Sequence, residues 1–225
     1  MKNILFLIAA ALLTGCVTPP QKPIEMDQNF LQKGSKKVGV MLTQMPIPDV
    51  YLPGANCLLC LAAAEVAVSD LSTHVETLAP DDFKLVESEL VKQLKAKGVD
   101  VIAINEVLDT ESLPEFSSEV EGFARLDYRG FGSKYKISHL LVIDVNAIGM
   151  IRNYASYIPV DDPRALVKGV SYLVDLKNNR YKWYKHIKVN KSAKGEWDEP
   201  PNFPALTNAY YQAIEMGREM VLSEF

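Results

Sequence analysis

Histidine and cysteine, which build most metal and nucleophilic sites, are scarce here, with 3 of each among 225 residues. His74, His139 and His186 stand far apart in the sequence, and each fits a structural or solvated role better than a ligand role. The sequence also lacks the G-x-S-x-G, P-loop, dinucleotide-binding and H-E-x-x-H motifs. We therefore expect no catalytic residues, no metal and no cofactor, and no enzymatic activity.

A strong excess of one charge is lacking too, since 24 basic and 28 acidic residues give a formal net charge of −4. Such a mild acidic balance argues against general nucleic-acid binding. Long apolar runs are absent after Leu13, so no later segment has the length that spans a bilayer. Attachment to a membrane would therefore need an anchor other than a membrane-spanning helix in the rest of the chain.

The N-terminal segment has the pattern of an export signal. Lys2 supplies a positive charge, and residues 4–13 form an uncharged apolar run that is too short for a permanent membrane helix. The segment closes on Leu13-Thr14-Gly15-Cys16. We predict a signal peptide over residues 1–15, and an ordinary cleaved signal with a chance cysteine remains the alternative.

The tetrapeptide that ends in Cys16 resembles the lipobox of bacterial lipoproteins. The resemblance implies that Cys16 is lipidated, with palmitate among its acyl groups, and becomes the new N-terminus. Val17 stands where an aspartate commonly signals inner-membrane retention in that family, so the resemblance implies an outer-membrane anchor facing the periplasm. Residues 16–36 contain prolines and polar residues without periodicity, which predicts a flexible tether.

Cys57 and Cys60 form a C-x-x-C pair in a compartment where disulfides persist. A small local disulfide, two buried thiols and a redox-active pair are all compatible with this spacing. The apolar neighbours, Leu58-Leu59 between the cysteines and Leu61 after them, favour the disulfide over redox activity. Two thiols without a nearby third ligand make a weak zinc site.

The hydrophobic pattern predicts alternating strands and helices. Strands are expected at residues 37–42, 99–104 and 139–145, a hairpin at 165–176 and 181–189, and helices at 80–97, 125–136 and 206–221. The first long helix carries an apolar stripe formed by Phe83, Val86, Leu90 and Leu94, and Gly98 is placed to end it. Because the turn after this helix is short, the strands on either side of it should be parallel. The sequence therefore predicts an α/β (α+β) fold over residues 37–225, with a single mixed sheet and flanking helices.

Two segments are candidates for contact with a partner. Residues 56–68 are almost wholly apolar, which favours a buried helix over a surface that meets lipid or protein. Residues 177–194 carry seven basic side chains, no acid and interleaved aromatic residues. Strict alternation places Tyr181, Trp183 and Lys185 on one face of that strand. The candidate partner-binding residues are Lys182, Trp183, Tyr184, Lys185 and Lys188. An exposed hairpin whose lysines keep the sheet edge soluble is the alternative.

The element order behind the lipobox, with the strand at residues 140–145 and the hairpin at 167–189, resembles one group of envelope lipoproteins. The group comprises relatives of the TolB N-terminal domain, the curli-secretion lipoprotein CsgG and the penicillin-binding-protein activators. The resemblance implies an anticodon-binding-like two- or three-layer sandwich and a non-catalytic role as an assembly, scaffold or accessory factor with an envelope protein partner. The long membrane hairpins of the curli channel are not evident in this sequence. The alternatives are a cell-wall or carbohydrate-modifying hydrolase with scattered carboxylates and a subunit of an oligomeric secretion pore. A second copy of the same chain, in a homo-oligomer, is a further candidate partner.

Overall fold

The computed structural model describes residues 20–27, 30, 36–118 and 120–225, and Cys16 lies outside these residues. Its strands are β1 (Lys37–Leu42), β2 (Asp49–Tyr51), β3 (Asp100–Ala103), β4 (His139–Ile151), β5 (Tyr154–Ala155), β6 (Ile158–Pro159), β7 (Arg164–Asp175) and β8 (Arg180–Ser192). Its helices are α2 (Leu58–Ala67), α3 (Ser69–Val75), α4 (Asp81–Ala96), α5 (Gly130–Tyr135) and α6 (Pro204–Leu222).

One mixed sheet of six strands organises the fold. Its order is β3-β1-β4-β7-β8, and β2 pairs with the far half of β4, while β5 and β6 form a separate small sheet. β1 is parallel to β3 and β4, whereas β4, β7 and β8 are successively antiparallel. The predicted α/β class, with one mixed sheet and flanking helices, is confirmed, and so is the parallel pairing across α4.

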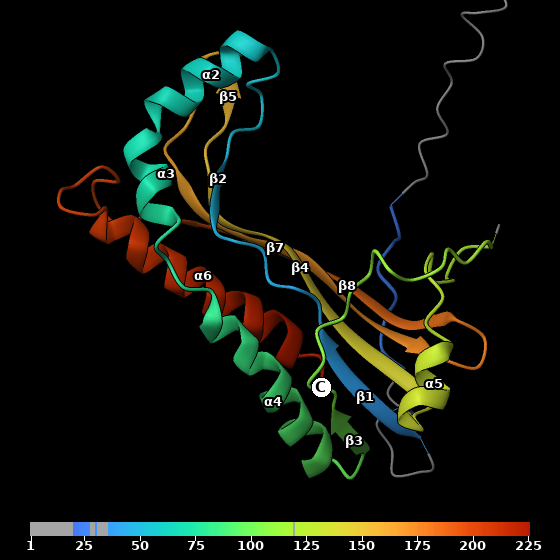
Figure 1. The fold of residues 1–225 in the computed structure, drawn as a ribbon. Helices are drawn as coiled ribbons and strands as arrows, with labels where there is room; N and C mark the ends of the chain where they lie inside the picture. Colours follow the sequence, from blue (N-terminus) through green and yellow to red (C-terminus); the bar gives the residue numbers. More distant parts are fainter. Residues whose placement is uncertain (1–19, 28–29, 31–35, 119) are drawn as a thin grey trace, which may run out of the picture.

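Helices α4 and α6 cover one face of the sheet (Figure 1). The predicted stripe of α4 is fully buried against this face, and Gly98 ends the helix with the positive φ of 80° that a left-handed cap requires. The two helices are joined by an ion pair between Arg218 and Glu89. Helix α5 lies on the opposite face, above a second apolar cluster that includes Tyr128 and Tyr172.

The three long strands extend beyond the body that α4, α5 and β3 surround. β4, β7 and β8 have 13, 12 and 13 residues, whereas β1 pairs only with the first part of β4, over residues 139–143. At the extended end, β2 replaces β1 beside β4, and α2, α3, β5 and β6 gather there (Figure 1). This end of the sheet holds the surfaces considered below.

Residues 20–27 of the predicted tether lie against the body. The backbone of Ile24 exchanges two hydrogen bonds with Tyr184 of β8, at 2.9 and 3.0 Å, and Met26 is buried. His186 Nε2 lies 3.1 Å from the carbonyl oxygen of Gln21. The described part of this segment therefore runs antiparallel to β8, in contrast to the flexible tether that the sequence predicts.

Candidate functional site

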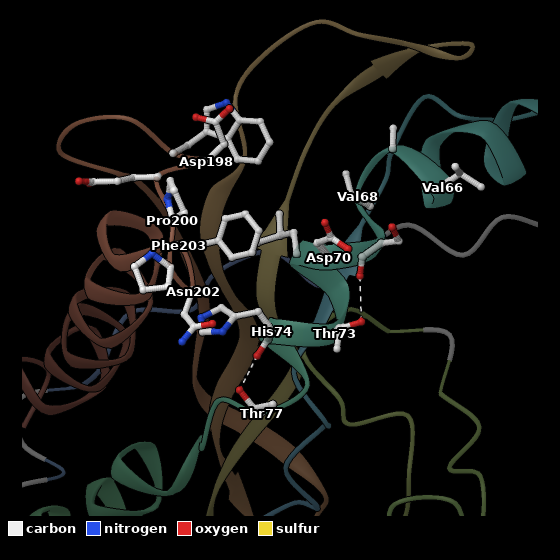
Figure 2. A pocket seen from close by; sticks show the side chains of 16 residues that line it. Val66, Val68, Asp70, Thr73, His74, Thr77, Asp198, Pro200, Asn202 and Phe203 are labelled. Carbon is white, nitrogen blue, oxygen red and sulfur yellow. Dashed lines mark hydrogen bonds between the residues drawn. The ribbon is translucent and has the colours of Figure 1, made fainter.

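A groove of about 840 Å³ lies between α3 and the loop before α6. Figure 2 shows side chains from both walls, with Asp70 and His74 on α3 and Asp198 and Phe203 on the loop. His74 Nε2 lies 2.7 Å from Thr207 Oγ1, which accounts for one of its ring nitrogens. The imidazole is therefore held by a structural contact.

The carboxylates of this groove are Asp70, Asp198 and Glu199, and all three are exposed to solvent. Glycoside hydrolysis needs paired carboxyl groups in contrasting environments, one of them with a raised pKa. Three carboxylates that are all exposed to solvent do not provide that contrast. Within the described part of the chain, no three His, Cys, Asp or Glu side chains are grouped so that they could hold a metal ion.

Next to the groove, the end of the molecule carries an exposed apolar surface, which we call the apolar tip and define as α2 together with residues 154–160. Leu58, Leu59 and Val66 of α2 are 85%, 81% and 77% exposed. Tyr157, Ile158 and Val160 of the neighbouring hairpin are exposed as well. The expectation that residues 56–68 are buried is wrong.

The exposure of α2 has a simple physical cause. Nine of the ten residues of the helix are apolar and Glu65 is charged, but only Cys60 and Ala64 are buried against other residues. These two side chains pack with Ala55 and Tyr154 in a small separate cluster. The other residues of α2 are exposed, since the helix lies at the outer end of the sheet (Figure 1).

Close backbone contacts attach the tip to the sheet. Gly54 has a φ of 93°, and a Cβ atom at this position would lie 1.8 Å from the carbonyl oxygen of Tyr154. The Tyr154 amide donates to the Pro53 carbonyl over 2.8 Å, and the Ser156 amide donates to the Gly54 carbonyl over 3.2 Å. The start of α2 is therefore fixed on the hairpin.

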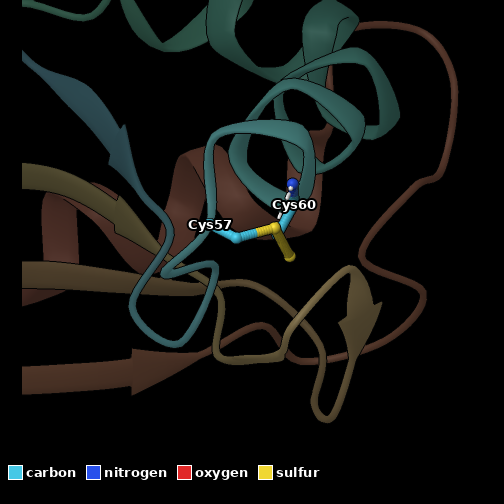
Figure 3. Close-up of a disulfide and its surroundings, with 2 residues drawn as sticks. All are labelled: Cys57 and Cys60. Atoms are coloured by element: carbon cyan, nitrogen blue, oxygen red, sulfur yellow. Dashed lines mark hydrogen bonds between the residues drawn. A yellow bond between two sulfur atoms is a disulfide. The ribbon is translucent and has the colours of Figure 1, made fainter.

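Cys57 and Cys60 form a disulfide across the first turn of α2 (Figure 3). Cys57 is the N-cap residue, and its Sγ accepts a hydrogen bond of 3.0 Å from the amide of Cys60. The bond links two residues that the helix already holds close together, with Cα atoms 4.9 Å apart. It closes the first turn of the exposed helix.

Asp161 fastens the base of the hairpin. Its Oδ1 accepts from the Asn153 amide over 2.8 Å, and its Oδ2 accepts from Arg164 Nη2 over 2.7 Å. The carbonyl of Asp161 accepts from Arg152 Nε over 3.0 Å. Asp161 thus fixes the geometry of the loop before Pro163.

The β8 residues predicted to bind a partner divide into buried and exposed groups. Trp183 is 1% exposed and packs against Phe225, so its placement on a contact surface is wrong. Lys182 pairs with Asp175 at 3.6 Å, and Lys185 pairs with Glu224. Tyr184 is half-buried, and Lys188 is exposed. The strand therefore contributes more to the core than its composition indicates.

A β-bulge explains why alternation fails in β8. The register shifts between Leu173 and Val174, which pair with Trp183 and Tyr181 and leave Lys182 as the extra residue. Tyr181 consequently lies on the same face as Tyr184, with ring centres 5.0 Å apart, rather than on the face of Trp183.

Buried polar groups line the face of the sheet below α5. The hydroxyl groups of Tyr128 and Tyr172 lie 2.7 Å apart, and burial raises the pKa of Tyr128 to about 12. Burial also raises the pKa of Asp144, although a hydrogen bond from Thr43 opposes the shift. The tyrosines therefore stay protonated near neutral pH and act as hydrogen-bonding core residues.

Sequence reasoning missed the hairpin of the tip and the contact at Gly54. The dipeptide Pro53-Gly54 is a turn signal, which could have marked the start of a separate unit. No local signal pairs residues 53–55 with residues 154–156, which are about a hundred positions away.

No single helix in the described residues is long and apolar enough to cross a membrane. Helices α2 and α3 meet the length and composition criteria only together, and they are bent by 71° where they join.

Comparison with known proteins shows no matching family and no matching curated protein. Solved structures with a similar arrangement include a DUF330 protein from Xanthomonas campestris, with 13% identity, a TM-score of 0.37 and coverage of 92% of this chain and 94% of that one. Lipoprotein GNA1162 from Neisseria meningitidis has 13% identity and a TM-score of 0.28, with coverage of 80% and 96%. The PelC dodecamer from Paraburkholderia phytofirmans has 11% identity and a TM-score of 0.32, with coverage of 88% and 95%. Likeness at this level carries no argument about function, and the resemblance to TolB, CsgG and the penicillin-binding-protein activators stays a prediction.

Proposed function

We propose that this chain is a lipid-anchored, non-catalytic accessory protein that helps to assemble or hold a complex of the bacterial envelope, at the periplasmic face of the outer membrane. The observation that carries the proposal is the apolar tip. Its leucines are exposed on a helix that is fastened to the sheet by Gly54 and Asp161. Several large apolar side chains exposed on a well-anchored, protruding element are typical of an attachment surface.

The groove also favours a non-catalytic accessory role over the hydrolase alternative. Asp70, Asp198 and Glu199 are solvated, so their environments give no reason for one carboxyl group to act as an acid beside a basic partner. The sequence motifs of the common hydrolases are missing as well. The features that remain are an anchor and contact surfaces.

Two matched variants separate an accessory role from catalysis. One replaces the groove carboxylates (Asp70→Asn, Asp198→Asn, Glu199→Gln), and the other replaces the tip leucines (Leu58→Ser, Leu59→Ser). All five side chains are exposed, so neither set removes a core contact. The readouts are crosslinking in intact cells, with identification of the captured envelope complex, and envelope integrity in cells without the native chain.

We expect the carboxylate variant to keep both the crosslinked complex and envelope integrity, and the leucine variant to lose both. Loss of integrity in the carboxylate variant, with the complex intact, would instead support catalysis. Failure of the wild-type chain to capture any defined envelope complex would contradict the proposal.

The proposed location has its own test. Val17→Asp introduces the residue that commonly retains lipoproteins of this type at the inner membrane. We expect the variant to move to inner-membrane fractions, and Val17→Ala serves as the control. Unchanged outer-membrane fractionation of the Val17→Asp variant would remove the sorting claim.

A further inference from the structure

The exposed surface of α2 extends around most of the helix rather than along one stripe. Leu58, Leu59 and Val66 are highly exposed, Leu61 is partly so, and only Cys60 and Ala64 are buried. A protein groove takes up one stripe of an amphipathic helix, at positions three and four residues apart. Exposed apolar side chains around most of a helix fit a surrounding apolar medium, such as the lipid of a membrane.

The length of α2 fits one leaflet. Ten residues form a helix of about 15 Å, which is about half the hydrocarbon thickness of a bilayer. Glu65 is the charged residue of this helix and lies near its C-terminal end, next to the polar start of α3. The tip therefore has the dimensions of an element that enters a leaflet without crossing the membrane.

Polar and aromatic side chains lie just behind the tip. The Arg152 guanidinium lies 4.9 Å from the ring centre of Trp197, and the same arginine donates to the Asp161 carbonyl. Arg164 pairs with Asp161 at the base of the hairpin. Arginine and tryptophan are the side chains that favour the headgroup level of a membrane, since each combines an apolar body with a polar group.

The described start of the chain lies beside β8, with its N-terminal end toward the tip. Gln21 and Ile24 lie antiparallel to His186 and Tyr184, so Gln21 is nearer than Ile24 to Ser192, where β8 reaches the tip. The distance from His186 to Ser192 along the strand is about 20 Å. Four residues lie between Cys16 and Gln21, and the five Cα–Cα steps that join them span at most about 18 Å. This maximum is about equal to the distance to Ser192, so the chain length permits a membrane that holds a lipidated Cys16 to meet the end of the sheet from which α2 projects.

We infer that the apolar tip inserts into the same lipid leaflet that holds the acyl chains of Cys16, so that the protein is attached to the membrane at two points. The inference rests on the proposed lipid anchor and adds an orientation to it. With the tip in the leaflet, the sheet stands away from the membrane, and α4, α5 and the lysines of β8 face the periplasm. The groove beside α3 then lies close to the membrane surface, where a membrane-bound partner can reach it.

The test uses the full-length lipidated protein, reconstituted in vesicles of phosphatidylethanolamine and phosphatidylglycerol that contain a lipid with a quenching doxyl group on its acyl chain. Tryptophan is placed on the tip (Leu59→Trp) or on the exposed side of α4 (Leu85→Trp). Both replaced leucines are exposed, and both variants keep Trp183 and Trp197 as a common background. Because the α4 variant has the same anchor, it measures quenching from anchoring alone.

We expect the doxyl lipid to lower the added emission at position 59 about twofold, and to leave the emission at position 85 almost unchanged. Charges in the hairpin (Ile158→Glu, Val160→Glu) should remove the quenching at position 59 while the protein stays in the vesicles. Equal quenching at both positions, or none at position 59, would overturn the inference. A blue-shifted emission of the tryptophan at position 59 in a detergent-stable dimer would also overturn the inference, because a second copy of the chain would then cover the tip. The vesicles contain no protein partner. Absence of quenching at position 59, together with a crosslinked complex retained in cells, would therefore contradict membrane insertion but not the proposed function.

Discussion

Gly54 packs so closely against Tyr154 that a Cβ atom at position 54 would lie 1.8 Å from the Tyr154 carbonyl oxygen. This contact joins the segment that leads into α2 to a hairpin about a hundred residues further along the chain. The exposed helix is thereby held at a defined place on the sheet.

Gly54→Ala should detach the tip. The positive φ alone costs about 1–3 kcal/mol for a residue with a side chain, and the overlap with Tyr154 adds to this cost. Gly195→Ala is the matched control, because Gly195 also has a positive φ, of 115°, but has no atom within 4 Å of the added Cβ. We expect amide hydrogen exchange over residues 54–68 and 153–160 to rise in the first variant and to stay unchanged in the control. Equal behaviour of the two variants would show that the contact with Tyr154 is unimportant.

The hydroxyl pair of Tyr128 and Tyr172 should behave as a coupled unit. Tyr172→Phe leaves the buried Tyr128 hydroxyl without this partner, which costs about 1–3 kcal/mol in the free energy of unfolding, and Tyr128→Phe should cost a similar amount. In the double variant no unpaired hydroxyl remains. Its decrease in the free energy of unfolding should therefore be clearly smaller than the sum of the decreases in the two single variants. Denaturant unfolding of the four proteins gives this comparison. Additive losses would argue that the two hydroxyl groups do not interact.

His139 should make the protein less stable in mild acid. Burial is the main cause that lowers its pKa from 6.5 to about 4, with Lys36 and Lys182 acting in the same direction and Asp175 opposing them. Between these values the unfolded chain binds the proton and the folded chain does not, so the free energy of unfolding falls as the pH decreases from about 6.5 to about 4. The contribution of this residue is at most about 3 kcal/mol.

The variant His139→Gln should therefore flatten the pH dependence of unfolding in that interval, and the exposed His186→Gln should leave it unchanged. Urea unfolding at half-unit pH steps measures the slopes. The same slope in wild type and His139→Gln would assign the acid sensitivity to other groups.

The predictable parts of this fold are those in which one local pattern reports one buried face. The residues Phe83 to Leu94 are spaced for a helix with one apolar stripe, and that stripe is buried as expected. Asn179 occupies the hairpin turn with a positive φ of 61°, in agreement with its side-chain type. Its bonds to the carbonyl groups of Ala124 and Leu126 are long-range contacts that no local pattern contains.

The tip could not be predicted, because α2 has apolar residues around most of its circumference and its sequence does not determine how many neighbours cover it. The length of β4, β7 and β8 relative to β1 decides this, since the long strands carry α2 beyond the helices that cover the sheet. In β8, the bulge at Lys182 moves Tyr181 to the face of Tyr184, and a strict period of two cannot anticipate an inserted residue.

Spin labels on the reconstituted full-length protein show whether the apolar tip lies in lipid. Labels on Leu59→Cys and Leu85→Cys report, by electron paramagnetic resonance, how often they collide with oxygen, which concentrates in lipid, and with a water-soluble nickel complex. We expect the label at position 59 to collide mainly with oxygen and the label at position 85 to collide mainly with the nickel complex. Nickel-dominated collisions at both positions would contradict insertion of the tip into lipid.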